Sequence, residues 1–206
     1  MKQTVKKLCL VLLSLLLLLS FTACGAVNSA EKSVHKMFEA YKALDFEEVK
    51  KYSDMGNFGF EDAENDLVTS DDQLMKTMFE KLDYEILSSS KSGDNTVFVT
   101  TNITALDIEP VFTGFISEAF AFFMEEENAS RELSEEEVKK VTSELLAKHI
   151  SKPDLQTKTE KIIIKVVKQD GKWKVASDMA LVDAITGGMI SFTNQLQTLT
   201  NTTAAE

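Results

Sequence analysis

Cysteine, histidine and proline are scarce in this chain, which has two of each among its 206 residues. Cys9 lies within an N-terminal apolar run and Cys24 at its end, so the remainder of the chain can form no disulfide and offers no thiol. Two histidines without thiolates or a His-Glu-x-x-His pattern do not indicate a zinc site. The chain also lacks a Gly-x-Ser-x-Gly sequence, the signature of one large class of serine hydrolases. We therefore expect no metal and no cofactor.

Positive charge is also in short supply. The chain has 22 Lys and Arg against 33 Asp and Glu, a formal charge of −11. Proteins that bind nucleic acid need a basic footprint, so we expect no nucleic-acid partner. Attraction to anionic lipid by charge is excluded for the same reason, and any attachment to a membrane must have another source.

The N-terminus supplies such a source. Lys2, Lys6 and Lys7 precede an almost unbroken apolar run at Leu8–Phe21, and small residues lead to Cys24. This order is typical of a signal peptide, and the run is too short for a membrane-spanning helix. The stretch resembles a bacterial lipobox, with Phe21 in place of the usual Leu. The resemblance implies that residues 1–23 are removed and that Cys24 becomes the diacylated first residue. The formal charge then falls to −14, because three lysines are lost. An ordinary signal peptide with an incidental cysteine is the alternative.

Residues 158–176 have the clearest local pattern, that of a β-hairpin. Asp170-Gly171 supplies the two positive-φ positions of a type I′ turn. The cross-strand pairs that follow are Lys168 with Trp173, Val166 with Val175, and Ile164 with Ser177. One face is then apolar and the other carries lysines: Ile162, Ile164, Val166, Trp173 and Val175 against Lys161, Lys165, Lys172 and Lys174. A sheet face this apolar has to be covered by helices.

Hydrophobic periodicity predicts helices on both sides of the strands. Helices are predicted from about residue 29 or 33 to 44, and at 45–52, 70–82, 110–124, 134–150 and 179–199, the last interrupted at Gly187-Gly188. Strands are predicted at 84–90, 96–106, 158–168 and 172–176. Helices segregated from an antiparallel sheet indicate an α+β fold, with N-terminal helices packed on a curved sheet and a helical insertion at 109–152. We predict a tether at 24–30, a single domain at 31–199 and a tail at 200–206.

Three segments together resemble a known family. They are the Gly171–Val175 strand, the Ile103-Thr104-Ala105 strand end that leads into a helix at Pro110, and the stretch Asp183–Gly188. With the lipobox, they are similar to Gram-positive bacterial lipoproteins that have nuclear transport factor 2-like domains of unknown function. The resemblance implies a sheet curled into a cone whose mouth can hold an apolar ligand. The insertion at 109–152 departs from the minimal fold and would cover or fill that mouth.

Aromatic residues near the insertion are the candidate ligand contacts. Phe112, Phe115, Phe122 and Phe123 recur on one predicted helix, and Trp173 alternates inward on the late strand. They either line a pocket for an apolar ligand or form ordinary core, because Phe at helical spacing is common in cores.

Other candidate sites are weaker. His35 lies beside the apolar stripe of the first helix, where we expect solvent exposure. His149 falls in the last turn of its helix, where the helix dipole favours a cation. A cone-fold enzyme would need a general base near an oxyanion donor. Tyr84 or Tyr52 with a buried carboxylate could provide these groups, but nothing in the spacing selects the carboxylate.

A calcium loop is also suggested and then excluded by residue type. Asp62, Glu64 and Asp66 alternate like its first ligands, but Leu67 replaces the required Gly and Gln73 the final Glu. We expect a solvated acidic loop.

These observations favour a non-enzymatic binding or interaction module. Acyl chains on Cys24, palmitate among them, would hold it on the outer face of the cell membrane, and two chains make such an anchor stable. Its partner would be an apolar small molecule or an envelope protein. A small cone-fold enzyme acting on an apolar ligand and a purely structural envelope protein are the alternatives.

We predict that Cys24 is the acylated mature N-terminus. Mass spectrometry of membrane-extracted protein should show a lipid-modified Cys24, and Cys24→Ala should move the protein out of the membrane fraction. Cys9→Ala is the matched control, because Cys9 leaves with the signal peptide. A Cys24→Ala protein that stays equally membrane-bound would contradict the prediction.

Overall fold

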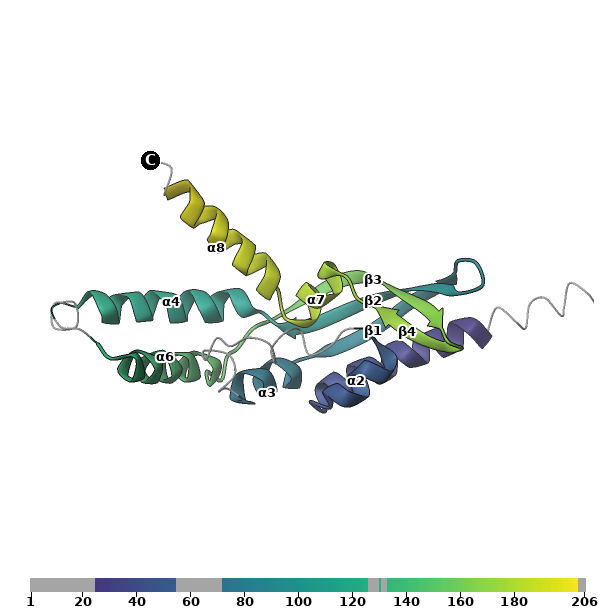
Figure 1. The fold of residues 1–206 in the computed structure, drawn as a ribbon, viewed down its shortest axis with the longest axis horizontal. Coiled ribbons are helices and arrows are strands. Elements are labelled where there is room, and N and C mark those ends of the chain that lie inside the picture. The colour runs from purple at the N-terminus through teal and green to yellow at the C-terminus, as the bar shows by residue number, and fades with distance from the viewer. Residues whose placement is uncertain (1–24, 55–71, 126–129, 131–132, 204–206) are drawn as a thin grey trace, which may run out of the picture.

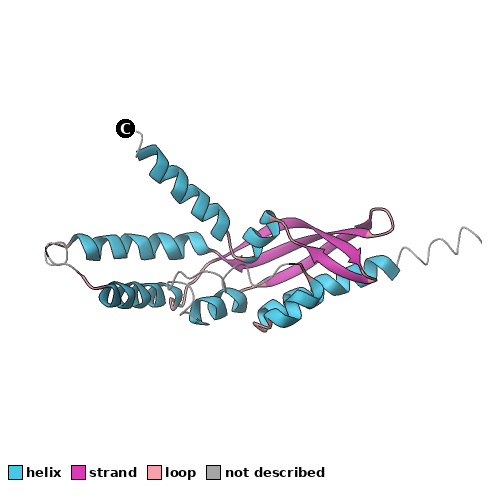
Figure 2. Cartoon of the chain, in the orientation of Figure 1, coloured by secondary structure: helices cyan, strands magenta, loops and turns pink. Residues whose placement is uncertain are grey.

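The computed structural model of the protein describes residues 25–54, 72–125, 130 and 133–203. Its strands are β1 Asp83–Lys91, β2 Thr96–Leu106, β3 Thr157–Gln169 and β4 Lys172–Ala176, in one antiparallel sheet ordered β1-β2-β3-β4 (Figures 1 and 2). The predicted α+β class is confirmed. The sheet is open, with β1 and β4 as its edges, so pairing of the described strands closes no cone.

The β3–β4 turn has the predicted geometry. Asp170 and Gly171 have φ values of 50° and 80°, as a type I′ turn requires. Lys168 pairs with Trp173, and Val166 with Val175, so the predicted register is confirmed. The predicted pair of Ile164 with Ser177 lies outside the ladder, because β4 ends at Ala176.

One face of the sheet is buried and is called the inner face here. In β2 its residues are Val97, Val99, Thr101, Ile103 and Ala105, each no more than 2% exposed. The register places Ile164 and Val166 of β3 beside Val99 and Val97, and they are equally buried. Ile163 is on the outer face and is 61% exposed. This alternation follows from the two-residue period of a strand.

A helix at residues 25–42 covers the inner face. Its apolar stripe is completely buried and consists of Val34, Met37, Phe38 and Tyr41. Each such side chain contributes about 1.5–3 kcal/mol when removed from water. The Ser33 hydroxyl donates to the Trp173 carbonyl at 2.8 Å and ties the helix to β4.

The helical structure extends beyond the predicted domain limits, residues 31 and 199, at both ends. Residues 25–30 are helical and do not form a tether, because Val27 and Ala30 continue the apolar stripe toward the N-terminus. At the other end, α8 Met189–Thr203 continues through residues 200–203, which were predicted to be tail.

Short helices complete the layer around the sheet. α2 Phe46–Tyr52 is capped by Asp45, whose carboxylate accepts from the Glu48 amide at 2.9 Å. α3 Asp72–Glu80 packs near β2, and α7 Met179–Ile185 contacts both β2 and β3. Residues 70 and 71, the start of the helix predicted at 70–82, lie outside the described residues.

The helical insertion between β2 and β3 forms a hairpin of α4 Ile108–Met124 and α6 Glu135–Ile150. Ser134 and Glu137 form a capping box at the start of α6. Figure 1 shows the hairpin extending beyond one end of the sheet, with the start of the 25–42 helix at the opposite end. The molecule is therefore elongated.

The hairpin leaves the sheet at a tight backbone junction. The Ile108 amide donates to the Gly187 carbonyl at 3.1 Å, and the Asp107 amide to that of Gln156 at 2.9 Å. Gly187 has φ of 66°, and a Cβ there would lie 1.7 Å from the Leu106 carbonyl oxygen. Only glycine can adopt this positive φ without strain and has no Cβ to clash with the carbonyl oxygen.

The two faces of β3 predict opposite responses at adjacent positions. Ile164→Ala removes methyl groups from a site that is 1% exposed, and should cost about 2–5 kcal/mol of unfolding free energy. Ile163→Ala, on the outer face, should change it by less than about 0.5 kcal/mol. Urea denaturation measures both values, and equal losses would show that the faces are wrongly assigned.

Candidate functional site on the helical hairpin

The base of the hairpin is a second apolar core, separate from the one under the sheet. It joins α4 and α6 to α3 and α8 through Leu74, Met78, Leu106, Ile108, Val111, Leu146, Ile150 and Phe192. Phe112 and Phe115 of α4 pack against its edge. This core fixes where the hairpin starts.

His149 connects the two helices with directional bonds. Its side chain is buried, and Nε2 lies 3.0 Å from Oε2 of Glu118 on α4. The Lys152 ammonium lies 3.0 Å from Nδ1. An ammonium can only donate, so Nδ1 accepts and the ring proton is on Nε2, which donates to Glu118. His149 does lie in the last turn of α6, as predicted, but it is a buried contact between α4 and α6.

Glu118 also receives a charged partner. The Lys148 ammonium binds its other carboxylate oxygen, Oε1. The bond from Lys148, with that from His149 second, lowers the pKa of the Glu118 carboxyl. One carboxylate of α4 therefore holds two side chains of α6.

Gly114 makes room for the imidazole ring. A Cβ at this position would lie 2.6 Å from Cε1 of His149 and 2.8 Å from Nδ1. Any side chain at position 114 would force the ring or the helix to move. The close approach of α4 to α6 therefore depends on this glycine.

A small pocket opens beside this contact. Its volume is about 160 Å³, and it is lined by Pro110, Val111, His149, Lys152, Asp154, Leu155 and Gln156. Pockets for drug-sized ligands are typically about 300–1,000 Å³. This one therefore has room for only a very small molecule.

The five predicted pocket residues are not brought together. Phe112 and Phe115 lie at the base of the hairpin, with ring centroids 6.2 Å apart. Phe122 and Phe123 contact each other at 5.3 Å, further along α4. Trp173 packs against the core under the sheet. The structure divides the five between two cores and the outer part of α4.

An exposed apolar stripe on α4 is a feature that we did not predict. Ile116, Phe120 and Met124 are 38%, 65% and 61% exposed. They are spaced four residues apart and so lie along one side of the helix. Phe112 begins the same series but is covered by Phe192 of α8 at 6.0 Å. The spacing is visible in the sequence, but exposure of its last three members is not.

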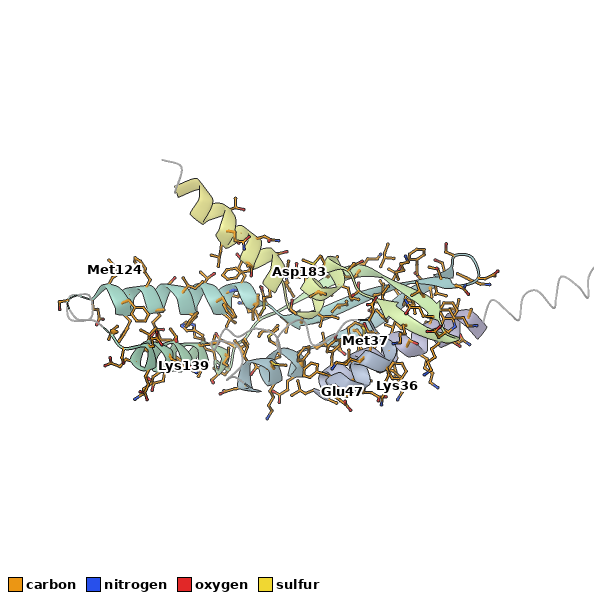
Figure 3. All side chains as sticks on the ribbon, viewed as in Figure 1. Lys36, Met37, Glu47, Met124, Lys139 and Asp183 are labelled. Carbon is orange, nitrogen blue, oxygen red and sulfur yellow. The ribbon has the colours of Figure 1, made fainter. Side chains whose placement is uncertain are left out.

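Figures 1 and 3 show why the stripe is uncovered. α8 meets α4 only near the base of the hairpin and then diverges, and Met124 lies at the far end of α4. α6 occupies the other side of α4 through the contacts described above. We refer to Ile116, Phe120 and Met124 as the α4 stripe.

The groups considered for enzyme chemistry lie elsewhere. His35 is exposed, as expected, and its Nδ1 contacts the Tyr84 hydroxyl. Burial, with Glu39 and Asp83 adding to it, raises the pKa of Tyr84 to about 12. Among the described residues the buried polar side chains are Ser33, Ser53, Thr101, His149 and Thr186. No carboxylate is among them.

The described ranges contain neither a candidate membrane span nor a candidate metal-binding cluster. No helix there is long and apolar enough to cross a membrane. Nor do those ranges contain three His, Cys, Asp or Glu residues grouped to hold a metal ion. Cys24 and the acids Asp62, Glu64 and Asp66 lie outside the described residues.

Comparison with known proteins finds little. No family model matches the chain, and no curated protein matches its sequence. One solved structure, of a putative lipoprotein (ycdA) from Bacillus subtilis subsp. subtilis str. 168, is similar over 77% of this chain, with 14% identity and a TM-score of 0.49. The match covers 56% of that protein, so this chain spans just over half of its length. The function therefore has to be argued from the chain's own residues.

The close contact at Gly114 predicts that Gly114→Ala has opposite effects on stability in the presence and in the absence of the His149 ring. Gly114→Ala should destabilise the protein, because the new methyl group meets the buried His149 ring. In a His149→Ala background, the same substitution should stabilise it by about 1 kcal/mol, the helix propensity of Ala over Gly. Chemical denaturation of the four proteins gives the coupling. Stabilisation in both backgrounds would show that the ring yields freely.

The lowered pKa of Glu118 predicts a pH dependence. A carboxyl with a lowered pKa in the folded state adds stability above its ordinary value, here 4.5, and loses it as the pH falls through the lower value. Glu118→Gln removes this contribution. The gap in unfolding free energy between the two proteins should therefore narrow below pH 4.5. A constant gap through that range would contradict the assignment.

Proposed function

We propose that this protein is a lipid-anchored, non-enzymatic binding module that uses the α4 stripe to bind a partner on the outer face of the cell membrane. The observation that carries the proposal is the exposure of three large apolar side chains in a row on α4. The anchor is Cys24, on the sequence argument given above.

Large apolar side chains exposed to water cost free energy unless a partner covers them. Single exposed apolar residues are ordinary on protein surfaces, whereas contiguous ones mark interaction sites. Phe120 and Met124 are each more than 60% exposed and lie one helical turn apart, with Ile116 one turn further along. The stripe is therefore a contiguous surface.

A macromolecular partner fits this surface better than a small molecule. The described pocket near His149 has a volume of about 160 Å³, too small for most ligands, and it lies at the base of the hairpin. The α4 stripe is convex and extends over two helical turns, which suits the face of another helix.

The arrangement along the chain supports the same proposal. The 25–42 helix starts at one end of the molecule, directly after Cys24, and the hairpin lies at the other end (Figure 1). An acyl group on Cys24 would then leave the stripe turned away from the membrane. A purely structural protein would give no reason for three exposed apolar side chains at that end.

We also infer kinship with the nuclear transport factor 2-like lipoproteins. A long N-terminal helix packed across the inner face of one antiparallel sheet supports the relationship. The open sheet and the hairpin distinguish this chain from the minimal cone.

The proposed surface can be tested with an apolar dye. The mature protein should enhance the fluorescence of the neutral dye Nile red, and Phe120→Ser should remove most of the enhancement. Ile163→Ser is the matched control, because Ile163 is as exposed as Met124 but lies on the outer face of the sheet. Equal signals from Phe120→Ser and the unchanged protein would exclude the α4 stripe as the binding surface.

A further inference from the structure

We infer that the partner of the α4 stripe is a cationic amphipathic helix, whose apolar face packs along Ile116, Phe120 and Met124 and whose basic residues are attracted by the acids of the hairpin. This inference rests on the proposed function and adds the chemistry of the partner to it. It is argued from the charges of the hairpin and from what surrounds α4.

Two exposed glutamates flank the stripe along the chain. Glu109 is exposed and precedes Ile116 by seven residues, two helical turns, so it lies on the same side of α4. Glu125 is exposed and directly follows Met124. α4 itself contains two glutamates and no basic residue. The stripe is therefore apolar, with one glutamate directly after Met124 and another two turns before Ile116, beyond Phe112.

The whole hairpin has the same sign. Residues 108–150 contain ten Asp or Glu and four Lys or Arg. α6 also begins with three glutamates, Glu135, Glu136 and Glu137. A partner with basic residues is attracted by this excess of acids, and a partner with acidic residues is repelled by it.

The neighbouring helix leaves space for such a partner. α8 contains no Asp, Glu, Lys or Arg, so it neither repels nor attracts a charged partner. It covers Phe112 through Phe192. Leu196, one turn further along, is half-buried against the core at the hairpin base. Beyond that point α8 diverges, so a docked helix would continue the cover that Phe192 begins (Figure 1).

Other candidate occupants of the α4 stripe are disfavoured by their negative charge. A second copy of the chain would bring the same acids, with a net charge of −11 on each chain. An anionic membrane would repel the hairpin for the same reason. Within the chain, residues 55–71 contain five acids and no Lys or Arg.

The test uses a fluorescein-labelled peptide of 18 residues, composed of Leu and Lys with apolar residues at helical spacing, and the mature protein. Fluorescence anisotropy should show saturable binding. Phe120→Ser and Met124→Ser should each weaken it about tenfold or more, because anchors at the centre of an interface dominate affinity. Ile163→Ser should leave it unchanged. Circular dichroism of each variant verifies that it remains folded.

Two matched peptides test the charge argument. A Leu/Glu peptide with the same pattern should not bind, and a scrambled Leu/Lys peptide without an apolar face should bind at least about tenfold more weakly. Glu109→Gln together with Glu125→Gln should weaken the Leu/Lys peptide about two- to fivefold, with the effect reduced at high salt.

The outcomes separate this inference from the proposed function. Binding of the dye at the α4 stripe without selective binding of the Leu/Lys peptide would overturn the inference and leave the proposed surface standing. Loss of both signals would overturn both. Equal affinity for the Leu/Glu peptide, or dimerisation of the mature protein that Phe120→Ser abolishes, would assign the stripe to a partner of different chemistry.

Discussion

The arrangement of this protein depends on a backbone contact that only glycine permits. At the end of β2, the Leu106 carbonyl lies where a side chain of residue 187 would otherwise be, and the Ile108 amide donates to the Gly187 carbonyl. Three parts of the fold meet there: the sheet, the hairpin and the α7–α8 segment. A residue with a Cβ at position 187 would have to separate them. The direction in which α4 leaves the sheet, and the place where α8 crosses it, both follow from this contact.

The side of α4 that faces solvent is decided by different forces. Apolar packing at the hairpin base is not directional and would tolerate some rotation of α4 about its axis. The bonds from His149 and Lys148 to Glu118 are directional, and Gly114 admits the imidazole at only one position along α4. Together they hold the Glu118 side of the helix against α6. Phe120, on the opposite side, is exposed as a consequence of these polar contacts.

Local patterns predicted most of the fold. Asp170-Gly171 sets the turn, and the turn sets the register of Trp173 and Val175, because both follow from rules that span a few residues. The α4 stripe could not be predicted in this way. Phe112 and Phe120 have the same residue type and helical spacing, and only the crossing of α8 makes one covered and the other exposed. The start of the first helix was missed because Val27 and Ala30 are weak signals beside the polar residues around them.

The position of the hairpin between β2 and β3 has a mechanical consequence. These are the two middle strands of the sheet: β2 pairs with β1 and β3 along most of its length, whereas β3 pairs with β2 over residues 157–167 and with β4 only over residues 165–169. A load applied at the tip of the hairpin, with the opposite end of the molecule held at a surface, would therefore enter the sheet through its middle. An edge strand can be peeled away one hydrogen bond at a time, whereas β2, from which α4 leaves, is paired with a neighbouring strand on both sides as far as Thr104.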